Sequence, residues 1–229
     1  MHRSQEQSRS DWILSAAGEQ LLRDGFWIGR VASEAELTAI AAGLGEPVPA
    51  RSTAPVLQDL VPLEAAGAPK KSLSALHGEG SFPFHTDGAH HRRPPRWVVM
   101  RCIDPGQGNR PTLLADGAPL PLTARQWREI ERAVWWVRSR GRSFPASIVK
   151  RTGEETVLRY DRGCMAPANP AFAAAGDLFE AAIEASDHVR LSWQAGDAVV
   201  FDNWRMLHAR GTASGPDTGV RRLQRILVR

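Results

Sequence analysis

The sequence predicts a mostly β protein with flanking helices, an α+β fold whose core is a β-sandwich or jelly roll. Short runs rich in β-branched and aromatic residues recur along the chain, and turns containing glycine and proline separate them. Helical periodicity is confined to a few segments. Many short strands with few helices are typical of packed antiparallel sheets.

Length and composition indicate one soluble domain spanning residues 1–229, with residues 1–12 expected to be a disordered tail. The chain is 42% hydrophobic and 24% charged, as is ordinary for a globular protein. We expect neither a signal peptide nor a membrane span, because no apolar run is long enough for either. The only cysteines, Cys102 and Cys164, form no CxxC pair, which argues against a thiolate zinc site and favours a reducing, cytoplasmic location.

The net charge of +4 is carried almost entirely by arginines that are scattered along the chain. Scattered charge is weak support for nucleic-acid binding. The densest cluster lies at residues 90–96, HHRRPPR. Two readings of it remain open: a solvated loop marked by Pro94 and Pro95, or a pocket mouth that attracts an anionic substrate.

The first elements are a strand and a helix. Residues 26–28 predict a short strand. Ser33 and Glu36 predict a capping box, and Gly43 and Gly45 predict the end of the helix. Its apolar face is expected to comprise Leu37, Ile40, Ala41 and Leu44.

The following elements are mostly strands. Residues 51–71, rich in proline, alanine and glycine, predict a surface connection that contains at most one strand and is placed to cover a pocket. Residues 96–103 are β-branched and aromatic and predict a central strand. Thr123 and Gln126 predict a capped helix. The other expected elements are strands over 111–115, 134–137 and 157–160, a helix over 170–185, and strands over 198–201 and 220–228 around a loop.

The pair His85 and Asp87 is the first candidate site. It forms an H-x-D motif after an apolar approach. In extended backbone alternate side chains point the same way, so both residues can face one metal ion while Thr86 faces away. Two donors do not complete a site for Fe(II), which in the facial triad takes two histidines and one carboxylate. A second histidine is required.

The stretch GDAVVFDNWRMLHAR supplies that histidine. The predicted strand over 198–201 leads into a polar turn at Asp202 and Asn203 and then to His208. We therefore predict His208 as the second imidazole ligand.

The terminal stretch VRRLQRILVR predicts an arginine pair on one face. Strand alternation places Arg221 and Arg225 together and Arg222 on the opposite face. An inward arginine near an iron site is costly to bury without a carboxylate partner. A dicarboxylate co-substrate would provide that partner.

These stretches resemble the taurine dioxygenase and clavaminate synthase-like family of Fe(II)- and 2-oxoglutarate-dependent oxygenases. The resemblance rests on HTD, PTLLAD, GDAVVFDNWRMLHAR and RRLQR in this order, and it covers essentially the whole chain. It implies a double-stranded β-helix, cupin-like core. It also implies that His85, Asp87 and His208 ligate iron, that Thr112 and Arg221 hold 2-oxoglutarate, and that Arg225 reaches co-substrate or substrate. Arg222 competes with Arg221 for the carboxylate role.

The resemblance further implies a dioxygenase that oxidises a C–H bond of a small molecule with dioxygen and releases succinate and carbon dioxide. Hydroxylation is the expected outcome, and desaturation or ring closure are alternatives. We expect an anionic or amino-acid-like substrate and no nucleic-acid or membrane partner, and the sequence says nothing about oligomeric state. The rival functions are a nucleic-acid-modifying oxygenase of the same superfamily and a non-enzymatic cupin-like binding protein.

Overall fold

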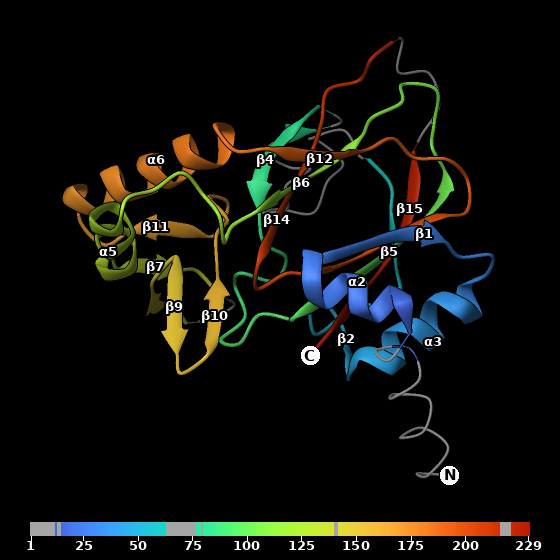
Figure 1. The fold of residues 1–229 in the computed structure, drawn as a ribbon, viewed down its shortest axis with the longest axis horizontal. Helices are drawn as coiled ribbons and strands as arrows, with labels where there is room; N and C mark the ends of the chain where they lie inside the picture. The colour runs from blue at the N-terminus through green and yellow to red at the C-terminus, as the bar shows by residue number, and fades with distance from the viewer. Residues whose placement is uncertain (1–11, 13–14, 63–76, 79, 140–141, 216–220) are drawn as a thin grey trace.

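The computed structural model describes residues 12, 15–62, 77–78, 80–139, 142–215 and 221–229. Residues 1–11 of the expected tail, residues 63–71 of the expected connection and Val220 lie outside this part of the chain. Figure 1 shows two regions: paired sheets with two blue helices, and a lobe of helices and short strands.

The larger sheet is antiparallel and has six strands. Its order is β1, β13, β5, β15, β2, and β3 also pairs with β15. The predicted strand over 96–103 is confirmed as the central β5, because its side chains are buried alternately on both faces of the sheet. The strands are β1 (Phe26–Arg30), β2 (Pro47–Val48), β3 (Gln58–Leu60), β5 (Trp97–Asp104), β13 (Asp197–Asp202) and β15 (Arg222–Val228).

The smaller sheet has four antiparallel strands in the order β12, β6, β14, β4. They are β4 (Phe82–His85), β6 (Thr112–Asp116), β12 (His188–Leu191) and β14 (Met206–Arg210). Met100 and Phe201 from the larger sheet share one buried cluster with Leu114 and Leu191 from the smaller sheet. The two sheets therefore pack face to face as a jelly roll, the predicted double-stranded β-helix.

Two helices cover the outer face of the larger sheet. They are α2 (Ala16–Asp24), which was not predicted, and α3 (Glu34–Leu44). Leu21 of α2 and Leu37 of α3 pack with Val99 and Ile226, which lie on the outer face of β5 and β15. This second core leaves the inner face of the same strands to build the site.

The capping box predicted for α3 is only half formed. The Ser33 hydroxyl accepts from Glu36 N–H at 3.2 Å, but the Glu36 carboxylate accepts from Ala32 N–H at 2.8 Å. The predicted stop at Gly43 is wrong, because that glycine lies inside the last turn. The helix ends before Gly45, where a Cβ would lie only 1.9 Å from the carbonyl oxygen of the C-terminal residue.

The lobe is inserted between β6 and β12. It contains α5 (Ala124–Arg132), α6 (Pro170–Glu184), β7 (Trp135–Val137), β8 (Phe144–Ala146), β9 (Val149–Thr152), β10 (Glu155–Leu158) and β11 (Met165–Pro167). The capping box of Thr123 and Gln126 is confirmed. Ile130, Trp135 and Phe179 form part of an apolar core. In Figure 1 this lobe packs beside the smaller sheet.

Two strand predictions need correction. The expected strand over 157–160 is β10, which ends at Leu158 because Arg159 and Tyr160 turn to bond the loop after β4. The expected loop between the last two predicted strands contains β14. No helix in the described ranges has the length and apolar character needed to cross a membrane.

Candidate metal centre

Two histidines face each other across the smaller sheet. His85 ends β4 and is paired directly with His208 of β14. Opposite residues of an antiparallel pair place their side chains on one face, and the two ring centroids are 4.1 Å apart. Both side chains lie inside the jelly roll, with exposures of 4% and 6%.

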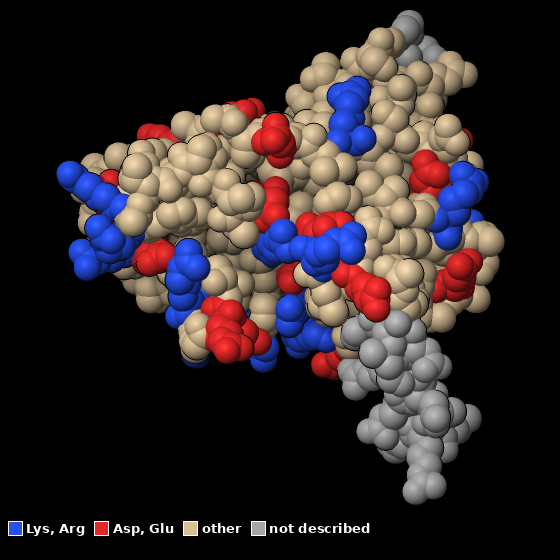
Figure 2. Space-filling view, viewed as in Figure 1, with Lys and Arg blue, Asp and Glu red and all other residues tan. Residues whose placement is uncertain are grey.

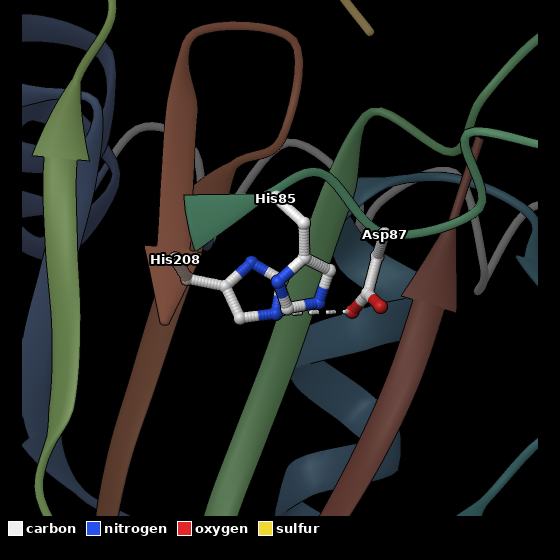
Figure 3. Close-up of side chains that lie close together, drawn as sticks. All are labelled: His85, Asp87 and His208. Atoms are coloured by element: carbon white, nitrogen blue, oxygen red, sulfur yellow. Dashed lines mark ion pairs between the residues drawn. The ribbon is translucent and has the colours of Figure 1, made fainter. Parts of the chain in front are cut away.

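Asp87 joins them from the turn that follows β4. Thr86 faces away, because its N–H donates to Tyr160 O at 2.7 Å and its hydroxyl accepts from Tyr160 N–H at 3.0 Å. The Asp87 carboxylate is 7% exposed and lies 3.8 Å from His208 Nε2. Figure 3 shows the side chains of His85, Asp87 and His208 pointing toward one place. One ligand atom of each lies within 4.8 Å of the others.

The surroundings of the two imidazoles suit metal binding. His85 Nδ1 lies 3.2 Å from the Pro83 carbonyl, which can only accept, so Nδ1 carries a proton. Burial is the main cause that lowers the pKa of His208 to about 3, and the nearby His85 is the second. The His208 ring is therefore uncharged at neutral pH and presents a lone pair.

The carboxylate is ionised because of Arg225. Burial is the largest single influence and favours the protonated acid, but the Arg225 guanidinium together with His208 and His85 outweighs it and holds the pKa of Asp87 below its ordinary value. Arg225 Nη1 donates to both carboxylate oxygens, at 2.7 and 2.9 Å, and Nη2 donates to Gln58 Oε1 at 2.7 Å. Arg225 thus ties β3 and β15 to the candidate ligand.

The donor set fits Fe(II). Two imidazoles and one carboxylate on one side of a buried space form the two-His-one-carboxylate arrangement, which leaves coordination positions open. The described residues thus bring together the three ligands predicted from the sequence.

The structure separates the two competing arginines. Arg221 is only 8% exposed and donates from Nη1 to Arg110 O at 3.0 Å. The Arg222 side chain is 50% exposed and pairs with Asp59 at 2.6 Å. Leu223 and Leu227 of β15 lie in the core between the sheets, which places Arg225 on the same inner face. The predicted faces are confirmed from Leu223 onward, but the pairing with β5 shifts between Arg222 and Leu223 and Arg221 precedes β15, so simple alternation does not extend to Arg221.

Thr112 begins β6 and is buried. It lies two residues before Leu114, the cross-strand partner of His208, and therefore shares its inward face. Its hydroxyl accepts from Trp193 Nε1 at 3.0 Å. One oxygen lone pair is used in this way and another is left for a ligand.

Sequence reasoning missed several polar residues around the site. Arg210, two residues after His208 and on the same face, donates to Gly80 O and Gly78 O, both at 2.6 Å. Alternation along an expected strand would have found it. No local signal marks Gln58, because only the β3 to β15 pairing brings it to Arg225.

A jelly roll with two histidines and a carboxylate on its inner face defines the class of cupin-like proteins with a facial-triad metal centre. The family described as taurine catabolism dioxygenase TauD, TfdA family matches residues 124–227. Clavaminate synthase 2 of Streptomyces clavuligerus is 28% identical over 172 residues, covering 69% of this chain and 52% of the relative. Residues 124–227 therefore match this family, and over 172 residues the chain is similar to clavaminate synthase 2.

The alignment spans about half the length of the curated relative. Solved structures match more completely in fold. Asparagine oxygenase with Fe(II), 3-hydroxyasparagine and succinate has a TM-score of 0.73 at 20% identity, covering 98% of this chain and 83% of that one. The non-heme iron oxygenase OrfP with Fe, succinate and (3S)-hydroxy-L-Arg has a TM-score of 0.72 at 15% identity, covering 99% and 84%.

Proposed function

We propose that this protein is an Fe(II)- and 2-oxoglutarate-dependent dioxygenase that hydroxylates an unactivated C–H bond of a small, anionic or amino-acid-like metabolite. The observation that carries the proposal is the convergence of His85, Asp87 and His208 inside the jelly roll. The match of residues 124–227 to the TauD, TfdA family and the similarity to clavaminate synthase 2 support it. A cytoplasmic location is part of the proposal and rests on the free Cys102 and Cys164.

Each ligand has a defined task. His85 and His208 would hold the metal through imidazole nitrogens, and Asp87 would neutralise part of its charge. Because Arg225 donates to both Asp87 oxygens, it fixes the carboxylate plane and restricts how the oxygens turn toward the ion.

The co-substrate would lie along the inner face of β15 and β6. Arg221 is the proposed partner of its distal carboxylate, because a buried guanidinium presents a planar pair of donors. Thr112 would add a hydrogen bond from its hydroxyl. Arg225 is already bonded to Asp87 and Gln58, and would orient co-substrate or substrate close to the metal.

Bound iron, with 2-oxoglutarate and dioxygen, supplies the oxidation: the co-substrate becomes succinate and carbon dioxide, and one oxygen atom enters the substrate C–H bond. The buried walls around His85 and His208 keep water from the reacting centre.

An amino-acid-like substrate is proposed from one observation. Hydroxylated asparagine or arginine is bound in the structurally similar oxygenases. Arg93 and Arg96 lie over Trp204, and Arg96 pairs with Asp202 at 3.3 Å, so the arginines that follow Asp87 in the sequence add no support. Desaturation and ring closure would use the same site and are distinguished by product mass.

Nucleic acid is not the proposed substrate. On the face drawn in Figure 2, Lys and Arg are interspersed with Asp and Glu and form no continuous stripe. A non-enzymatic binding protein would not need a complete donor set with open positions.

The test is succinate formation from 2-oxoglutarate in the presence of Fe(II) and dioxygen, without added substrate. We expect slow uncoupled turnover that is lost in Asp87→Ala. The wild-type protein is then incubated with a metabolite mixture, and a mass gain of one oxygen identifies the substrate. Iron binding without any succinate would refute the enzymatic proposal.

A further inference from the structure

Asn203 lies at the meeting point of the two chain segments that carry the metal ligands. It follows β13 in the turn that leads to β14, five residues before His208. The side chain is completely buried. Its backbone N–H donates to Arg96 O at 2.6 Å, which fixes the turn against the start of β5.

The Asn203 amide binds the backbone of Asp87 on both sides. Oδ1 accepts from Asp87 N–H at 2.7 Å, and Nδ2 donates to Asp87 O at 2.9 Å and to Pro95 O at 2.8 Å. The orientation of the amide follows from its partners, since an N–H can only donate and a carbonyl can only accept. No other uncharged side chain of this size offers an acceptor and two donors in one plane.

Asp87 depends on this contact because it has no strand partner. The residue lies in the turn after β4, so ladder hydrogen bonds do not fix its Cα. Arg225 holds only the carboxylate, and Tyr160 holds the preceding Thr86. The Asn203 amide is therefore the contact that sets the backbone from which the carboxylate projects.

We propose that Asn203 is a positioning residue that sets the distance between Asp87 and His208 and thereby the affinity of the metal centre. The inference rests on the proposed function, because it assumes that these residues bind a metal. A residue that orients a ligand from behind typically changes metal affinity by about 10–100-fold when it is altered.

The decisive variant is Asn203→Asp, which keeps the shape and one acceptor but loses both donors. A carboxylate oxygen would then face the carbonyls of Asp87 and Pro95. In an anaerobic Co(II) titration followed by visible absorption, we expect affinity to fall by about 10–100-fold. We also expect the Co(II) spectrum to move toward that of Asp87→Ala.

Asn169→Ala is the matched control. Asn169 Oδ1 accepts from Phe172 N–H at 3.1 Å and caps α6. This residue belongs to the lobe and is distant in sequence from the candidate ligands. Its loss should lower stability, as judged by urea unfolding of the metal-free protein, and should leave Co(II) affinity and spectrum at wild-type values. This separates positioning from a general loss of stability.

The outcomes are distinct. The inference is overturned if a folded Asn203→Asp variant binds Co(II) with wild-type affinity and spectrum. If that variant does not fold, Asn203→Ser, which introduces a smaller side chain, is tested in the same way. A second test needs no variant: hydrogen exchange of the Asp87 backbone amide is measured in the metal-free wild-type protein. Exchange as fast as that of an open loop also overturns the inference. Absence of Co(II) binding by wild type would instead refute the proposed metal centre, and the inference with it.

Discussion

The jelly roll and the lobe bury opposite kinds of residue. Between the two sheets lie His85, Asp87 and His208 together with buried arginines. The lobe core is apolar and aromatic, with Trp135 and Phe179 at its centre. Charged groups of the lobe such as Arg162 pair with carboxylates that are 39% to 70% exposed.

Because of this difference, the lobe mainly contributes to the free energy of unfolding, and the jelly roll carries the groups that would bind a ligand. Burying charge costs free energy unless every group is paired, so the jelly roll keeps a polar interior only where a ligand is to be bound. The lobe buries mostly apolar side chains; its buried Arg159 donates to the carbonyls of His91 and Arg92, and with Tyr160 it supports the loop that follows β4. Substitutions in the two regions should therefore fail in different assays.

The largest effect is expected in the jelly roll. His85→Ala, Asp87→Ala or His208→Ala should each abolish Fe(II) binding and activity while the fold remains, because two ligands do not hold the ion with normal affinity. Asp87→Glu should weaken activity rather than remove it. Metal analysis and circular dichroism test this, with His188→Ala as a control that removes a histidine outside the triad. Wild-type iron stoichiometry in any two of the alanine variants would refute the assignment.

The next effect concerns two neighbouring arginines at the start of β15. Arg221→Ala should raise the KM for 2-oxoglutarate by roughly 30- to several-thousand-fold, since removing one partner of a desolvated charge pair costs ~2–5 kcal/mol. Arg222→Ala should change it little, because its pair with Asp59 is half exposed. Titration of 2-oxoglutarate against uncoupled succinate production compares them. The assignment fails if Arg222→Ala is the variant that loses affinity.

In the lobe the expected effect is on stability alone. Ile130 of α5 is fully buried in the apolar core, so Ile130→Ala should cost about 2–5 kcal/mol in the free energy of unfolding. Co(II) affinity should stay at the wild-type value under conditions where the variant is folded. Arg128→Ala, exposed on the same helix, is the control for urea unfolding. A large loss of metal affinity in Ile130→Ala would show that the regions are not separable.

The smallest expected effect is on the rate of thiol labelling, which is compared between one cysteine from each region. Burial raises the pKa of Cys102 in the jelly roll to about 11, and burial also raises the pKa of Cys164 in the lobe. Only thiolates react, so at pH 8 the labelling of Cys102 should be about 100-fold slower than that of an ordinary thiol. Labelling with a disulfide reagent in native and urea-unfolded protein measures this. Fast reaction of both cysteines in the native state would contradict it.

The sequence predicted strands best where both faces are apolar. The pattern of β5 and β13 alternates between two hydrophobic layers, and both were found. β14 was missed although it is fully buried, because two of its inward residues are His208 and Arg210. Strands that build a polar site therefore lack the signal by which strands are recognised.

The sequence predicted which candidate ligands lie together but not the residues that support them. Spacing and alternation were enough to group His85 and Asp87, whereas the register shift before Leu223 means that alternation alone does not place Arg221. The contacts of Asn203 and Gln58 depend on pairings between distant segments, which a single sequence does not reveal. Arg159 was likewise not found, because its guanidinium bonds backbone carbonyls and leaves no residue pattern.

The pairing of β4 with β14 has a consequence for folding. Asp87 and Asn203 are 116 positions apart in the chain, and β4 must find β14 after the whole lobe has been synthesised. Contacts of such long range form slowly, because the entropy of closing the intervening loop is lost before the contact is gained. A metal ion held by His85, Asp87 and His208 together would therefore stabilise the completed fold by mass action.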